Sequence, residues 1–150
     1  MKKQSRKPDD RRKGTSRKRV TLQYPASLKP EDLLDFIELP IFTARWEKLG
    51  LDDEDDLTAL QITIMTAPTA ARVIVGTSGL RKLRFAPVRW ETGKSGATRV
   101  LYVYFEQFAT VLLCLVYGKN EIGAISDGGK KYINKLIAEI EQELHKIYSR

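Results

Sequence analysis

Basic and phenolic side chains gather in the middle of this 150-residue sequence, where they could bind and act on phosphate groups. From Arg81 to Arg99 there are six Lys and Arg residues against the single acid Glu91. A local excess of one charge concentrates a ligand of the opposite charge, whatever the net charge of the whole chain. The cluster therefore indicates a polyanionic ligand, of which nucleic acid is the usual case.

The spacing of these residues is that of a strand. Lys82 and Arg84 alternate with Leu83 and Phe85, so the two cations share one sheet face. The candidates for chemistry are Lys82, Arg84, Lys94, Arg99 and Lys119, and those for RNA contacts are Arg81, Tyr102, Tyr104 and Tyr117. Strand parity raises one difficulty. Residues 99 and 102 are three apart and point to opposite faces unless a bulge intervenes or Arg99 lies just before the strand.

Metal-free cleavage of RNA is a reaction that such residues can perform. The 2′-hydroxyl must lose its proton, the pentacoordinate phosphate must be stabilised, and the departing 5′-oxygen must be protonated. Crowded like charges lower the pKa of a lysine, which makes it a usable base or acid. Arginine forks stabilise the added negative charge, and a tyrosine stacks on a base. We expect these three roles to fall on Lys82 or Lys94, on Arg84 and Arg99, and on Tyr102 or Tyr104.

Other kinds of site match the sequence poorly. Gly93-Lys94-Ser95 resembles part of a phosphate-binding loop, but the earlier glycine that such a loop requires falls at Val88. The single histidine, His145, lies near the chain end, and with the single cysteine it cannot make the usual zinc site. Cys114 sits in an apolar run, as a buried reduced thiol does. We therefore expect neither a metal nor a cofactor.

The elements that position the candidates follow from capping and periodicity. We expect a first helical turn at Pro30–Asp32, strands at Asp35–Leu39, Leu80–Ala86, Thr98–Phe105 and Thr110–Tyr117, and helices at Pro40–Trp46, Asp53–Met65 and Asp127–Tyr148. Helices first, then a three-stranded meander, then a closing helix predict an α+β fold with a twisted antiparallel sheet.

The charge is divided between two parts of the chain. The first 20 residues hold ten Lys/Arg and two Asp, a net charge of +8, and the remaining 130 carry −1. We predict a disordered basic tail over residues 1–28 and a folded domain over 29–150. The longest apolar run, Val111–Tyr117, is too short for a membrane span, and no apolar stretch follows the basic N-terminus. These features favour a cytoplasmic protein that does not act at a membrane.

Three blocks in order, Gly76–Ala86, Gly93–Tyr102 and Leu115–Glu121, resemble the signature of HigB-type toxins of the RelE/ParE superfamily. Phe36–Phe42 also resembles the family's first strand, so the resemblance covers about residues 35–145. It implies two helices packed on a twisted antiparallel sheet with a C-terminal helix. It also implies the toxin of a type II toxin–antitoxin system, an endoribonuclease that cleaves mRNA on the translating ribosome and so inhibits translation.

The same resemblance implies partners and site residues. The partners are mRNA on the ribosome and a cognate helix-turn-helix antitoxin of the HigA type. By matching position, Lys82, Arg84 and Arg99 fall on the family's site strands, Lys119 falls in the basic block after the last strand, and Lys94 belongs to a glycine-basic loop. The chain departs from the family where Thr77-Ser78-Gly79 stands for Thr-Gly-Gly and Ala97-Thr98 stands for Gly-Gly.

Two alternatives stay open at this point. The first is a poison of DNA gyrase, as in the ParE branch, which would bind without cutting RNA. The convergent cationic residues argue against it, because such a binder needs no cationic pocket. The second is a non-catalytic module that binds RNA or ribosomes through the +8 tail, and it predicts that deleting the tail abolishes binding.

Overall fold

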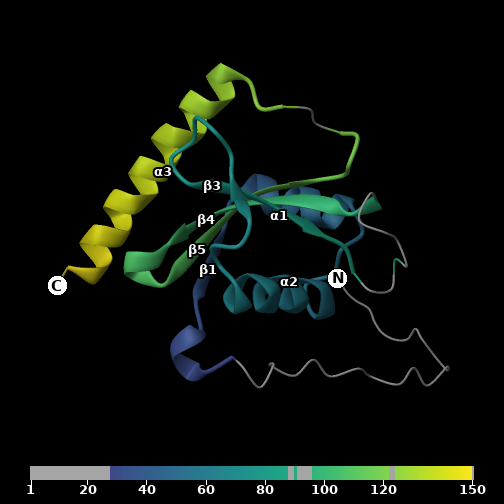
Figure 1. The fold of residues 1–150 in the computed structure, drawn as a ribbon, viewed down its shortest axis with the longest axis horizontal. Helices are drawn as coiled ribbons and strands as arrows, with labels where there is room; N and C mark the ends of the chain where they lie inside the picture. Colours follow the sequence, from purple (N-terminus) through teal and green to yellow (C-terminus); the bar gives the residue numbers. More distant parts are fainter. Residues whose placement is uncertain (1–27, 88–89, 91–95, 122–123, 150) are drawn as a thin grey trace.

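A computed structural model describes residues 28–87, 90, 96–121 and 124–149. One five-stranded sheet, in the order β1-β5-β4-β3-β2, lies between α3 on one face and the pair α1 and α2 on the other (Figure 1). The elements are β1 (Asp35–Glu38), α1 (Pro40–Lys48), α2 (Asp55–Thr66), β2 (Arg72–Val73), β3 (Leu80–Phe85), β4 (Thr98–Phe105), β5 (Thr110–Tyr117) and α3 (Asp127–Tyr148), with 3-10 turns at Pro30–Asp32 and Glu106–Phe108.

The predicted α+β class and the meander of β3, β4 and β5 are confirmed. Two features complete the sheet. The first strand, β1, pairs parallel with β5, so the sheet is mixed rather than wholly antiparallel. A short strand missing from the prediction, β2, pairs antiparallel with β3 at the opposite edge. The predicted tail over residues 1–28 lies, apart from Leu28, outside the described residues.

The face that α1 and α2 cover holds the larger aromatic core. Trp46 stacks between Phe42 and Phe85, with ring centroids 5.5 and 6.0 Å away, and its indole Nε1 donates to the Asp52 carbonyl at 3.0 Å. Pro40 fits the first turn of α1 because its ring sets φ and its missing N–H would have no partner there. These contacts anchor the two short helices to the end of β3 that carries the basic residues.

The other face is covered by α3, whose apolar stripe packs Ile137 and Leu144 against the sheet. Ser126 caps the helix by accepting from the Gly129 amide at 3.0 Å. Asn134 then fixes the loop before β3: its amide nitrogen donates to the Gly76 carbonyl at 3.0 Å, and its oxygen accepts from the Ser78 amide at 2.8 Å. The start of β3 is thereby tied to α3. Among the helices of the described ranges, none has the length and apolar character of a membrane span.

The turn between β4 and β5 contains a residue in an unfavourable conformation. Ala109 has φ 47° and ψ 44°, in the left-handed region where a Cβ costs about 1–2 kcal/mol. Its carbonyl accepts from the Asp35 amide at 3.0 Å and so aligns β1 with β5. We expect Ala109→Gly to stabilise the protein by about 1 kcal/mol in chemical denaturation. A lower midpoint of unfolding for this variant would contradict the geometry.

The single cysteine lies at an irregularity of β5. Leu101 pairs with Leu115 but Tyr102 pairs with Leu113, so Cys114 is the extra residue of a β-bulge. Burial raises the pKa of the Cys114 thiol to about 12. The reactive thiolate is then only about one part in 10⁴ at pH 8. We expect disulfide-forming thiol reagents to label the folded protein very slowly and the urea-unfolded protein at once; equal rates would show that the thiol is accessible.

Candidate nucleic-acid interface

Two arginines and a tyrosine form one row across three strands, on the face of the sheet that also carries α3. Arg84 of β3 pairs directly with Arg99 of β4, and Arg99 pairs directly with Tyr117 of β5. Directly paired residues point to the same face, with Cβ atoms about 4.5–5.5 Å apart. The row therefore brings two guanidinium groups and a phenol to one place.

A second pair of cations lies beside this row. Lys82 of β3 is two residues from Arg84 and shares its face, and it pairs directly with Arg72 of β2. We call Arg72, Lys82, Arg84 and Arg99 the cationic face. Arg72 was not predicted, because β2 has only two residues; the run of β-branched residues after it, Val73-Ile74-Val75, is the signal that could have found the strand.

Both pairs place like charges directly opposite each other, which destabilises a sheet. Within the described part of the chain, no carboxylate forms an ion pair with a residue of the cationic face. Lys82 and Arg84 are exposed, and Arg99 is half-buried. Repelling cations on neighbouring strands are the expected arrangement for a surface that binds an anion.

The bulge at Cys114 is what places Tyr117 in the row. Leu112 and Tyr117 are five residues apart and would face opposite sides of a regular strand, yet both belong to the core under α3. Burial raises the pKa of Tyr117, an effect that the neighbouring positive charge of Arg99 opposes. The phenol is therefore protonated at neutral pH, and it can donate a hydrogen bond but not act as a base.

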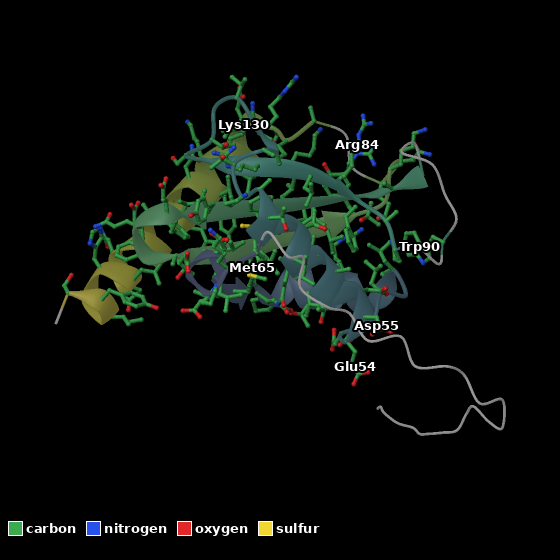
Figure 2. The ribbon with its side chains drawn as sticks, turned by 60° about the horizontal axis from the view of Figure 1, so that its bottom comes forward. Glu54, Asp55, Met65, Arg84, Trp90 and Lys130 are labelled. Carbon is green, nitrogen blue, oxygen red and sulfur yellow. The ribbon has the colours of Figure 1, made fainter. Side chains whose placement is uncertain are left out.

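Two hydrogen bonds fix the position of the row at the start of β4. Arg99 donates from Nη1 to the Ala97 carbonyl at 2.6 Å, and the Thr98 hydroxyl donates to the Phe85 carbonyl at 2.7 Å. Figure 2 shows Arg84 projecting from the side of the molecule that also carries Lys130 of α3, whereas Glu54 and Asp55 lie toward the opposite side. Glu54 and Asp55 are thus separated in space from Arg84.

Of the two other predicted site residues, one is described by the structure. Lys119 is exposed in the turn that directly follows β5, two residues beyond Tyr117. Lys94 lies outside the described residues.

Three predicted RNA contacts are on the opposite face, with α1 and α2. Arg81 donates from Nη1 to the carbonyls of Thr69 and Ala71, at 2.9 and 2.7 Å. Tyr102 is 1% exposed, and its hydroxyl donates to the Pro68 carbonyl at 2.8 Å. These three bonds tie the segment after α2 to the sheet.

Tyr104 also faces away from the cationic face. It packs against the aromatic core and lines a cavity of about 240 Å³ with Met65 and Pro68. The expectation that all the tyrosines and cations converge on one surface is therefore wrong for Arg81, Tyr102 and Tyr104. The reason is the parity of β3 and β4, since these residues are an odd number of positions from Arg84 and Arg99.

No family model matches the sequence. Among solved structures, the chain is similar to a mutant of the E. coli toxin RelE in the free state, with a TM-score of 0.46 and 17% sequence identity. The match covers 71% of this chain and 97% of that chain. At this identity no side chain is carried over from one protein to the other. In the described ranges, no group of three or more His, Cys, Asp or Glu residues is placed to hold a metal ion.

Proposed function

We propose that this chain is a metal-independent endoribonuclease of the RelE type that cleaves mRNA, with its active site on the cationic face. The single observation that carries the proposal is that cations lie directly opposite each other at two places on one face of the sheet, Arg84 with Arg99 and Lys82 with Arg72. A fold that keeps two such pairs without carboxylate partners in the described chain loses stability to do so, and an RNA phosphate removes that repulsion when it binds.

The row suggests how the reaction proceeds. The guanidinium groups of Arg84 and Arg99 bind the oxygens of the scissile phosphate and stabilise the extra negative charge as the 2′-oxygen attacks. Lys82 or Lys94 takes the proton of the 2′-hydroxyl, and the same or the other lysine gives a proton to the departing 5′-oxygen. Tyr117 is 4% exposed, so in the proposal its protonated phenol orients Arg99 from within the core and does not contact the phosphate. The products are a 2′,3′-cyclic phosphate and a 5′-hydroxyl end.

The sequence resemblance supports the finer assignment. In the proposal, the protein is a HigB-type toxin of a type II toxin–antitoxin system, which acts in the cytoplasm on mRNA held by the translating ribosome. Its antitoxin is a helix-turn-helix protein of the HigA type. The ten Lys and Arg residues among residues 1–20 add affinity for RNA that depends on salt concentration and not on the RNA sequence. The folded toxin domain is assigned to residues 29–150.

Induction of the full chain in a bacterial host tests the proposal. We expect growth arrest, new mRNA 5′ ends within open reading frames, and plasmid supercoiling that stays normal. Intact transcripts together with relaxed plasmids would favour a gyrase poison of the ParE type instead. A variant that starts at Lys29 should still cut RNA, whereas a binder driven by the tail would lose its affinity.

A further inference from the structure

The turn that follows β5 is held by a carboxylate outside the cationic face. Glu121 folds back over the turn: its side chain accepts from the Gly118 amide, and its own amide donates to the Gly118 carbonyl at 3.2 Å. Lys119 and Asn120 form the tip between them. Tyr117, the last residue of β5, is directly joined to this turn.

An arginine from α1 fastens the turn to the sheet. The parallel strand β1 ends opposite Leu113, so the outer edge of β5 beyond that residue pairs with no strand among the described residues. Arg45 binds this edge instead of a strand: its Nε donates to the Val116 carbonyl at 2.8 Å, and its Nη2 donates to the Glu121 carboxylate at 2.7 Å. Arg45 is 22% exposed and Glu121 is 40% exposed, so the pair is only partly open to water.

We propose that Glu121 and Arg45 are positioning residues for the site, which hold Lys119 and Tyr117 against the cationic face. This inference rests on the proposed function. One guanidinium binds both the end of β5, at the Val116 carbonyl, and the Glu121 carboxylate that closes the turn. The strand end and the turn are therefore held together. A catalytic group displaced by about 1 Å can lose roughly 10²-fold in rate. Arg45 and Glu121, which we call the clamp, therefore affect the reaction without contacting the substrate.

The clamp has a pH signature. The Gly118 amide, the Arg45 guanidinium and the Lys48 ammonium lower the pKa of Glu121 below 4.5. A carboxyl whose pKa is lower in the folded state than in the unfolded state stabilises the fold above the unfolded value, and this contribution is lost as pH falls through the folded value. We expect the difference in melting temperature between wild type and Glu121→Gln to shrink as pH falls below about 4.5.

Single-turnover cleavage of ribosome-bound mRNA by the full chain tests the inference, with Glu121→Gln as the main variant. Glu143→Gln is the matched control, because Glu143 also forms an ion pair, with Lys146 at 3.1 Å, but in an exposed position on α3. We expect Glu121→Gln to cleave about 10-fold more slowly or worse at unchanged mRNA affinity, and Glu143→Gln to cleave like wild type. Exchange of the Gly118 amide with solvent should also accelerate in Glu121→Gln alone.

A double-mutant cycle shows whether Glu121 acts through the turn. If it does, Lys119→Ala should slow cleavage less in Glu121→Gln than in wild type, because Glu121→Gln has already displaced Lys119. Additive losses, or full activity in folded Glu121→Gln, would overturn the inference. If Glu121→Gln fails to fold, Arg45→Lys serves instead, since one ammonium cannot hold both acceptors; full activity there overturns it too. If the wild-type protein does not cleave RNA at all, the proposed function itself is contradicted.

Discussion

Replacing Arg84 or Arg99 by alanine should abolish RNA cleavage and leave the protein at least as stable as wild type. Removing one preorganised donor to a developing anion costs about 10²–10³ in rate. Arg84→Ala also removes a repulsion between directly paired guanidinium groups, which should raise the free energy of unfolding by about 0.2–1 kcal/mol. In Arg99→Ala the loss of the bond to the Ala97 carbonyl offsets that gain. Growth after induction and urea unfolding of the purified variants measure the two effects separately.

The control for diffuse charge is Lys146→Ala, which removes an equally positive and largely exposed side chain from α3. It should keep full toxicity. If Lys146→Ala were as inactive as Arg84→Ala, general attraction to RNA and not a defined site would explain the activity. If Arg84→Ala lost stability instead of gaining it, the inferred repulsion between Arg84 and Arg99 would be wrong.

Two tyrosines only fifteen residues apart should respond in opposite ways to the loss of a hydroxyl. Tyr102→Phe loses the buried bond to the Pro68 carbonyl and should cost about 1 kcal/mol of stability with little effect on cleavage. Tyr117→Phe loses the hydroxyl that orients Arg99 and should slow cleavage by about 10²-fold with little effect on stability. Thermal melts and cleavage rates of both variants check the pair.

The opposite outcome would be informative as well. Loss of cleavage in a stable Tyr102→Phe, with an active Tyr117→Phe, would place the site on the face of α1 and α2. That result would restore the expectation that Tyr102 stacks on a base and would remove the cationic face from the mechanism.

Most elements could be predicted because their signals are local. The bounds of β4, β5 and α3 agree with the prediction to the residue, since β4 and β5 are long runs rich in residues that favour strands and α3 has one apolar stripe at helical spacing. The pairing of β1 with β5 could not be predicted, because it joins segments more than 70 residues apart. The strand β2 was missed because two residues are too few to show alternation.

The candidate site was predicted in part for a similar reason. Alternation within β3 correctly placed Lys82 and Arg84 together. The grouping of Arg81, Tyr102 and Tyr104 with the cations neglected strand parity, which separates them from Arg84 and Arg99. Which residues of β3 and β4 lie directly opposite each other depends on the register, which side-chain types do not reveal. Tyr117 shares the face of Arg99 only because of the bulge at Cys114, and a bulge inside an unbroken apolar run leaves no mark on the hydrophobic pattern.

The chemistry of the cut ends tests the central claim most directly. RNA recovered after induction of wild-type protein should carry 5′-hydroxyl ends at the new cut sites, with 2′,3′-cyclic phosphates on the matching upstream fragments. These ends follow from attack by the 2′-oxygen, the reaction that a cationic face can stabilise. Arg84→Ala and Arg99→Ala should produce neither. New 5′-phosphate ends, or cyclic phosphates that persist undiminished in both arginine variants, would contradict the account.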